Sequence, residues 1–219
     1  AVSMAAAVVM GNASPAAQVQ AAGTESVGAE SSAELIPVPK EMSADGTELT
    51  VTDAVNIAGA EEADADAVRD LREFLDANGI TVNEQADEAD TTFILGEADD
   101  EIPALEDAKD RLSMSGADGL GDEGYVLNVD PGDSAGGTIV IEGKDGDGTF
   151  YGVQTLRQLA EVRDGKTVIA SAEITDEPTM SVRGTIEGFY GNPWSHDDRI
   201  SQIEFYGDMK MNTYIYAPK

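Results

Sequence analysis

Apolar residues alternate between the period of a strand and the period of a helix from residue 35 to about residue 173. Val51 to Ile57 predicts a strand, and Glu61 to Ala77 predicts a helix, because apolar residues recur there every three or four positions. Asn78-Gly79 is the expected C-cap, since glycine readily adopts the left-handed conformation that ends many helices. The apolar stripe of this helix comprises Ala67, Val68, Leu71, Phe74 and Leu75.

The same alternation predicts one compact domain over residues 35–178 that mixes strands and helices. Pro103 marks the first turn of its second helix, where a missing N–H group costs little. The other predicted elements are strands over Ile80–Val82, Thr91–Leu95, Tyr125–Val129, Thr138–Ile141 and Thr167–Ile174, and a core helix over Gly148–Val162.

Residues 179–219 carry a pattern of their own. Val182 to Glu187 predicts a strand, Asp197 to Met209 a helix, and Asn212 to Tyr216 a second strand. Strand, helix and strand together make one βαβ unit. We place the domain boundary near Thr179, because Asp176 to Pro178 interrupts the preceding strand.

The first 34 residues differ from the rest of the chain. Ala1 to Met10 is almost wholly apolar, and small and polar residues follow through Ala22. This order is typical of the apolar and cleavage regions of a secretory signal whose charged start is missing, and it predicts a secreted or cell-surface protein. Ten residues fall short of the roughly 20 that cross a bilayer. The alternative to a signal is a flexible tail without function. Gly11 to Glu34 is predicted to be a linker, because it has few large apolar groups.

The net charge of −30 is concentrated in the first 180 residues, which hold 38 acidic and 9 basic side chains, against 5 and 4 in residues 181–219. Such a surface repels nucleic acid and anionic lipid, so we expect neither as a partner. It fits the hydrated surface of a secreted or salt-adapted protein. The composition makes no prediction of oligomeric state.

The sequence contains few residues that could bind a metal or carry out thiol chemistry. The chain has no cysteine and a single histidine, His196, which excludes disulfides and Cys/His zinc sites. Acidic residues are dense from Asp87 to Glu101, but they lack the spacing of a calcium-binding loop. We therefore expect no metal and no cofactor.

Several carboxyl groups could serve an acid–base reaction, and each has a structural alternative. Asp197-Asp198 follows Ser195 in a capping-box arrangement before an apolar-periodic run, so helix capping explains it better. Asp99-Asp100-Glu101 also precedes a helix and belongs to the acidic front part of the chain, so capping and solvation explain it. Glu187 lies at a strand end, either as a catalytic acid or as a buried partner of Arg183. His196 is expected to pack or cap, and Tyr206, Tyr214 and Tyr216 to fill core and rim.

Three stretches resemble a known enzyme family. RGTIEGFYGNPWSHDDR, Arg183 to Arg199, and MNTYIYAPK, Met211 to Lys219, resemble the opening of the catalytic barrel in glycoside hydrolase family 84. These retaining β-N-acetylglucosaminidases include O-GlcNAc hydrolases and bacterial enzymes once called hyaluronidases. FYGVQTLRQL, Phe150 to Leu159, resembles the closing helix of the small domain before the barrel in families 84 and 20. EGFYG favours family 84, because the first family 20 strand typically runs from RG to an aspartate and an arginine.

The resemblance implies an α/β fold: a signal remnant and linker over residues 1–34, a small α+β domain over 35–178, and the first strand-helix-strand of a TIM (β/α)8 barrel over 179–219. Barrel sites lie at the C-terminal ends of the strands. The resemblance implies that Gly188 and Lys219 hold sugar hydroxyls and that Tyr190 lines the pocket. The residues alone leave other roles open: Gly188 as a turn former, Tyr190 as packing and Lys219 as a solvated chain end.

The implied substrate is terminal β-linked N-acetylglucosamine on glycans or glycoproteins. In this family the substrate's own acetamido oxygen is the nucleophile, and two consecutive aspartates on a later strand assist it. We therefore expect a fragment with no catalytic residue of its own, and more exposed apolar area in Val182–Lys219, or contact with the first domain. The alternatives are a non-catalytic carbohydrate-binding or adhesin segment and a salt-adapted structural domain.

Overall fold

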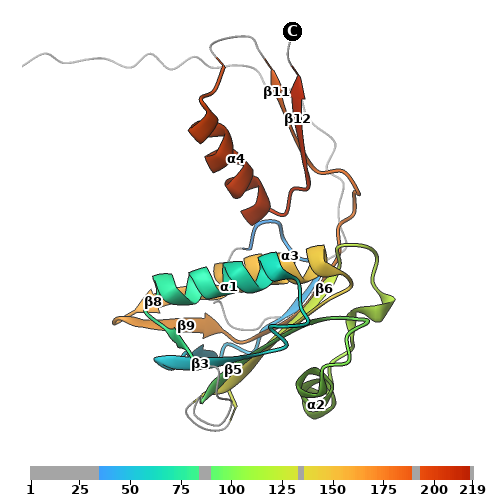
Figure 1. Ribbon diagram of the computed structural model, residues 1–219. Coiled ribbons are helices and arrows are strands. Elements are labelled where there is room, and N and C mark those ends of the chain that lie inside the picture. Colours follow the sequence, from blue (N-terminus) through green and yellow to red (C-terminus); the bar gives the residue numbers. More distant parts are fainter. Residues whose placement is uncertain (1–34, 84–89, 133–135, 189–192, 218–219) are drawn as a thin grey trace, which may run out of the picture.

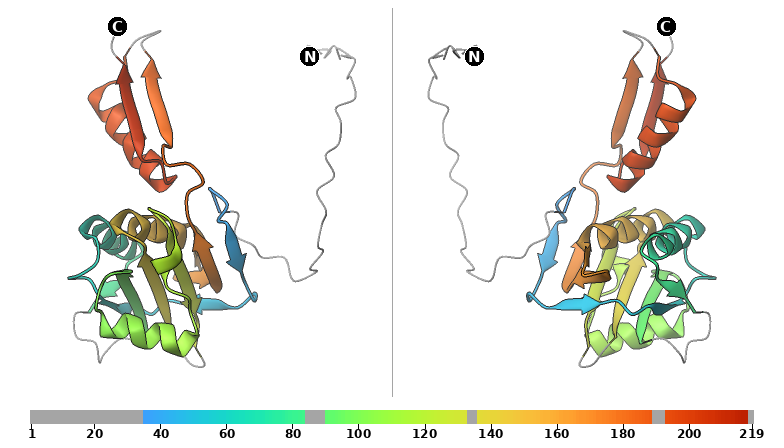
Figure 2. Two further views of the ribbon diagram at one scale, coloured as in Figure 1. Left: turned by 90° about the vertical axis from the view of Figure 1, so that its right-hand side faces the viewer. Right: turned by 90° about the vertical axis from the view of Figure 1, so that its left-hand side faces the viewer.

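The computed structural model describes residues 35–83, 90–132, 136–188 and 193–217 (Figure 1). We call residues 35–178 the front domain and residues 179–217 the βαβ unit. The predicted signal and linker segment, residues 1–34, lies outside the described residues. Figure 2 shows the βαβ unit standing on one end of the front domain.

The front domain is built on a mixed sheet. Its elements are β1 (Glu41–Ser43), β2 (Glu48–Thr50), β3 (Ala54–Ala58), α1 (Ala65–Ala77), β4 (Thr81–Val82), β5 (Thr91–Glu97), α2 (Pro103–Leu112), the 3-10 turn η2 (Ala117–Gly119), β6 (Tyr125–Asp130), β7 (Gly137–Gly143), α3 (Gly146–Leu159), β8 (Ala160–Arg163), β9 (Lys166–Ala170) and β10 (Ala172–Asp176). Seven strands lie in the order β1-β10-β6-β7-β5-β3-β4, and β2-β9-β8 form a smaller sheet. β7, β5, β3 and β4 run parallel, whereas β1, β10, β6 and β7 pair antiparallel.

Helices cover both faces of the large sheet, so its central strands are apolar on both sides. In β5, Phe93 and Leu95 belong to the larger core beneath α1 and α3, while Ile94 lies on the opposite face with Leu105 and Ala108 of α2. Figure 1 shows α1 and α3 on one side of the sheet and α2 on the other. The predicted α/β fold class is confirmed.

The helices follow the apolar pattern closely. α1 begins at Ala65 rather than at Glu61, because the Asp64 carboxylate caps the helix by accepting from the N–H groups of Asp66 and Ala67. Gly79 has a φ of +72° after the C-cap Asn78, as predicted. The predicted stripe is largely buried, with Ala67, Val68, Leu71 and Leu75 in the core and Phe74 packed against it.

Three expectations about the front domain were wrong. The helix predicted to reach Val162 ends at Leu159, where Ala160 becomes extended and pairs with Ile169 of β9. The strand predicted over Thr167–Ile174 is two strands in different sheets, β9 and β10, which separate at Ser171 as its N–H binds Thr47. Asp99-Asp100-Glu101 does not cap α2, because Asp100 instead accepts from the N–H of Glu97.

The βαβ unit comprises β11 (Gly184–Gly188), α4 (His196–Asp208) and β12 (Thr213–Ala217), with the two strands parallel. α4 has no buried residue, and large apolar side chains stay exposed, among them Val182, Ile186 and Phe205. The expected excess of exposed apolar area is therefore present, and polar contacts also join the unit to the front domain. Thr179, the predicted boundary, lies in the connection between β10 and β11.

A search of the described ranges finds no helix with the length and apolarity of a membrane span.

A close backbone contact at the start of α3 gives the first prediction. A Cβ on Gly148 would lie 2.1 Å from the carbonyl oxygen of Gly124, while a Cβ on Gly119 would meet nothing within 4 Å. Gly148→Ala should lower the free energy of unfolding by about 2 kcal/mol, and Gly119→Ala should change it by less than about 0.5 kcal/mol. Urea unfolding followed by circular dichroism compares the two, and equal stabilities would contradict this packing.

Candidate functional site

The C-terminal ends of β11 and β12 meet at one edge. In the parallel pairing Gly184 faces Thr213 and Gly188 faces Ala217, so both strands finish side by side. We call the end formed by Gly188 and Ala217 the strand-end edge. Figure 1 shows it pointing away from the front domain.

One of the three predicted substrate-binding residues lies at this edge. Gly188 is exposed at the last position of β11. Because side chains alternate along a strand, Gly188 shares the face of Ile186, two residues earlier. Tyr190 and Lys219 lie outside the described residues, so their roles stay predictions.

Glu187, next to Gly188, is held by an ion pair instead of facing the edge as a free acid. Its side chain is 5% exposed and accepts hydrogen bonds from Arg199 Nε and Nη2, at 2.7 and 2.8 Å, and from the hydroxyl of Tyr214. These partners, Arg199 first, lower the pKa of Glu187 to about 2. The carboxylate is therefore ionised at neutral pH, and its partner is Arg199 rather than the predicted Arg183.

Aromatic rings and α4 complete this polar layer. The Arg199 guanidinium lies 5.1 Å from the ring centre of Tyr216, and the rings of Tyr206 and Tyr214 lie 6.4 Å apart. Because Arg199 belongs to α4, Glu187 points toward the helix side of the two strands. Ile186, on the other face of β11, is 66% exposed.

The start of α4 matches its predicted capping role. Ser195 caps the helix by accepting from the N–H of Asp198, and the Asp198 carboxylate accepts from Ser195 N at 3.1 Å, which completes a capping box. His196 is the exposed first residue of the helix. Helix capping thus accounts for Asp198, as the sequence predicted.

The N-terminal ends of β11 and β12 contact the front domain. Glu123, in the loop before β6, accepts from Arg183 Nη1 at 2.6 Å and from Asn212 Nδ2 at 2.8 Å. Arg183 also donates to the carbonyl oxygens of Lys210 and Met180, at 2.9 and 2.8 Å. One front-domain carboxylate thus binds the residues just before both strands.

Lys210 makes a second contact between the two parts. Its side chain is 8% exposed, and Nζ donates to the hydroxyl of Tyr125 at 2.7 Å and to Asp176 at 3.2 Å. Tyr125 in turn donates to Asp176 and lies 2.7 Å from the hydroxyl of Thr155. Burial lowers the pKa of Lys210, and the Asp176 carboxylate opposes that shift. Burial also raises the pKa of Tyr125, which keeps its hydroxyl protonated.

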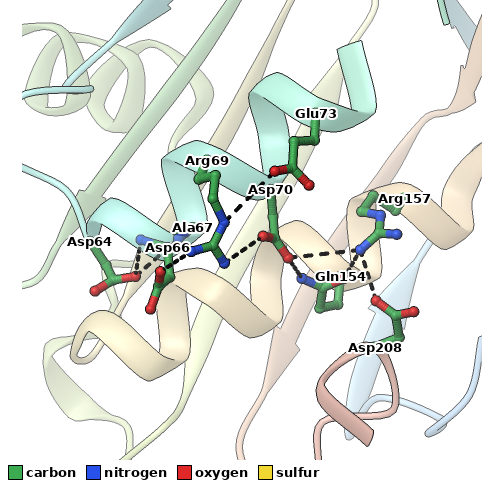
Figure 3. A network of polar contacts seen from close by, with 9 residues as sticks. All are labelled: Asp64, Asp66, Ala67, Arg69, Asp70, Glu73, Gln154, Arg157 and Asp208. Atoms are coloured by element: carbon green, nitrogen blue, oxygen red, sulfur yellow. Dashed lines mark hydrogen bonds and ion pairs between the residues drawn. The ribbon is translucent and has the colours of Figure 1, made fainter. Parts of the chain in front are cut away.

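A third contact reaches the end of α4. Arg157 of α3 donates to Asp208 at 2.8 Å and also binds Gln154, which donates to Asp70 of α1 at 3.0 Å. Figure 3 shows this network running from the start of α1 across α3 to Asp208. The network links α1, α3 and α4 through side chains alone.

The parallel strands of the front domain end at a second place where α/β sheets often bind ligands. Here, however, two carboxylates cap helices. Asp64 caps α1, and Asp145 caps α3 by accepting from the N–H of Gly148. Asp145 also accepts from the N–H of Glu123, in the loop before β6. Burial and neighbouring carboxylates raise the pKa of Glu97 and of Asp147. The described residues contain no group of three or more ligating side chains placed to hold a metal ion.

Five residues that join the two parts were not among the sequence predictions: Glu123, Arg157, Asp176, Lys210 and Asn212. Each binds a partner far away in the sequence, so no local pattern marks it. A lysine and an asparagine directly before a strand, in Lys210-Met211-Asn212, were the available hint.

Comparisons with known proteins find matches to both the front domain and the βαβ unit. The family model described as "Glycosyl hydrolase family 20, domain 2" matches residues 32–177, and the one described as "beta-N-acetylglucosaminidase" matches residues 183–219. Among solved structures, CpGH84B is 38% identical with a TM-score of 0.72 over 86% of this chain, and CpGH84D is 28% identical with a TM-score of 0.72 over 85%. The chain covers 30% of each of those structures.

A family 20 enzyme shares the fold at lower identity. The exo-β-N-acetylglucosaminidase from Vibrio harveyi, solved in complex with N-acetylglucosamine, is 18% identical, with a TM-score of 0.61. The match covers 84% of this chain and 25% of that one.

The low pKa of Glu187 predicts how acid affects the βαβ unit. A carboxyl whose pKa is depressed by folding contributes stability above its unfolded pKa of roughly 4.3 and loses it as the pH falls through the folded value. The fluorescence of Trp194, the only tryptophan, should therefore report a loss of stability between pH 4.5 and 2. Glu187→Gln should be less stable at pH 7 and lack this acid-dependent step; an unchanged step would contradict the assignment.

Proposed function

Because this chain belongs to glycoside hydrolase family 84, with a front domain of the family 20 domain 2 type, we propose that it forms part of a secreted β-N-acetylglucosaminidase. Its substrates would be glycans or glycoproteins that carry terminal β-linked N-acetylglucosamine. The observation that carries the proposal is the strand-end edge: two parallel strands ending together at Gly188 and Ala217, within the segment that matches β-N-acetylglucosaminidases. Barrel enzymes place their sites at such ends.

The proposed sugar site uses the face of β11 opposite α4. Gly188 lets a sugar ring approach the backbone closely, because it has no side chain. By their resemblance to the family, Lys219 would hold sugar hydroxyls and Tyr190 would line the same pocket. The exposed side chains of Ile186 and Ile215 lie on paired positions of the two strands, on the face that would become the packed interior of a barrel.

The reaction we propose is hydrolysis assisted by the substrate. The acetamido oxygen attacks the anomeric carbon, the bond to the leaving oxygen breaks, and an oxazoline forms. One aspartate orients the acetamido group, accepts its N–H proton as the oxazoline forms, and returns the proton when the ring opens. Its neighbour donates a proton to the leaving oxygen and later accepts one from the water that attacks the anomeric carbon. Both aspartates would come from a later barrel strand, in the part of the family structures that this chain does not cover.

Glu187 is a poor candidate for the acid in this scheme. A general acid must hold a proton near neutral pH, whereas Arg199 keeps the pKa of Glu187 at about 2. Its carboxylate also points to the helix side, toward Arg199 and Tyr214. Its role is to fix α4 against β11.

Secretion is a separate proposal, supported by the apolar run Ala1–Met10 and the strongly acidic composition. Mass spectrometry of the protein recovered from the culture medium tests it. A mature N-terminus between Met10 and Glu34 is the expected result, and retention inside the cells would contradict it.

Hydrolysis of 4-methylumbelliferyl N-acetyl-β-glucosaminide tests the function. We expect activity in the product of the complete gene and none in the 219-residue chain alone. In the complete protein, Gly188→Val should lower kcat/KM at least about tenfold, because a branched side chain fills the approach of the sugar. Ser201→Ala, on the exposed side of α4, is the control. Activity of the short chain would place the acid within it, and an inactive complete protein would favour a carbohydrate-binding role.

A further inference from the structure

Four non-glycine residues among those described have a positive φ: Ser113 (56°), Glu123 (63°), Asp164 (52°) and Lys210 (57°). In this left-handed region a side chain crowds its own backbone, so glycine is the residue with the lowest cost. Each of these positions therefore keeps its side chain at a cost in conformational energy.

All four lie in local turns: Glu123 in the turn closed by the Gly124 N–H and the Gly121 carbonyl, and Lys210 directly after α4. Ser113 is the C-cap of α2, and Asp164 lies in the hairpin between β8 and β9, followed by Gly165 at a φ of 75°. What distinguishes Glu123 and Lys210 is that they lie on opposite sides of the junction between the front domain and the βαβ unit, and both extend charged side chains across it.

The two contacts are complementary. Glu123 is a front-domain anion that accepts from Arg183 and Asn212, the residues just before β11 and β12. Lys210 is a cation of the βαβ unit that enters the front domain, with its ammonium 4.8 Å from the ring centre of Tyr125 and bonded to Asp176. Each of the two residues thus meets an opposite charge on the other side of the junction.

The rest of the junction provides little apolar packing. A cleft of about 1020 Å³ lies between α4 and the helices of the front domain, lined by Asp66, Asp70, Phe150, Ile203 and Asp208 among others. The α4 residues Ile200, Ile203 and Phe205 are each more than 40% exposed. The placement of the βαβ unit therefore depends mainly on polar contacts at its strand starts, supplemented by the Arg157–Asp208 ion pair.

We propose that the front domain is the anchor for the first two barrel strands, and that Glu123 and Lys210 are the positioning residues through which it holds them. Both strands are held at their N-terminal ends, and their C-terminal ends are left open for a ligand. The anchoring itself is independent of the enzymatic activity; only its consequence for glycan binding rests on the proposed function.

Glycine substitutions test the anchor with matched controls in the 219-residue chain. Ser113→Gly and Asp164→Gly remove the conformational cost of a positive φ at positions outside the junction. Both should therefore leave the unfolding midpoint unchanged or slightly raised. Lys210→Gly and Glu123→Gly relieve the same conformation but remove the charged contacts. Two probes follow urea unfolding: Trp194 fluorescence for the βαβ unit and hydrogen exchange of the β5 and β7 amides for the front domain.

The wild type should give one midpoint with both probes. Lys210→Gly and Glu123→Gly should move the Trp194 midpoint to lower urea, speed amide exchange in β11 and β12 at least tenfold, and change β5 and β7 less than twofold. Lys210→Arg, which keeps the charge, should restore the common midpoint, and Lys210→Met should not. If Lys210→Gly and Glu123→Gly behaved like the two controls, or if Lys210→Met matched the wild type, the proposal would be overturned.

Discussion

Two ion pairs at the starts of β11 and β12 determine where the βαβ unit lies. Arg183 and Asn212 meet at Glu123, and Lys210 enters a site formed by Tyr125 and Asp176. Burial lowers the pKa of Lys210, so desolvation offsets part of the attraction between its ammonium and Asp176. A buried ion pair of this kind favours one arrangement, because any other leaves Asp176 without its partner. The contacts therefore fix the orientation of the βαβ unit on the front domain.

This arrangement separates the two ends of the strands. The N-terminal ends hold the side chains that bind the front domain, and the C-terminal ends hold Gly188 and Ala217. Glu187, which precedes Gly188 in β11, is paired with Arg199 and turned toward α4. In a (β/α)8 barrel, stability and chemistry are divided in the same way between the two faces. The front domain can therefore hold the two strands without reaching the strand-end edge.

Local pattern was enough to predict most of the fold. The stripe of α1, the proline that opens α2 and the capping box at Ser195 each arise from residues close in sequence, and all three were predicted. The errors arose where distant partners decide: Ala160 leaves the helix to pair with Ile169, and β9 and β10 part at Ser171 because their neighbours lie in different sheets. The same holds for the candidate site. The place of Gly188 at the end of a strand could be predicted from its motif, whereas the Glu187–Arg199 ion pair and the contacts at the junction join residues that the sequence does not place together.

We propose that the sugar binds where β11 and β12 end, and that the front domain holds the two strands where they begin. A crystal structure of the complete protein soaked with N-acetylglucosamine tests it most directly. We expect the sugar within contact of Gly188, on the face of β11 opposite α4, with the Glu123–Arg183 and Lys210–Asp176 contacts intact. A sugar bound instead at the junction or on the front domain, away from the strand ends, would contradict it.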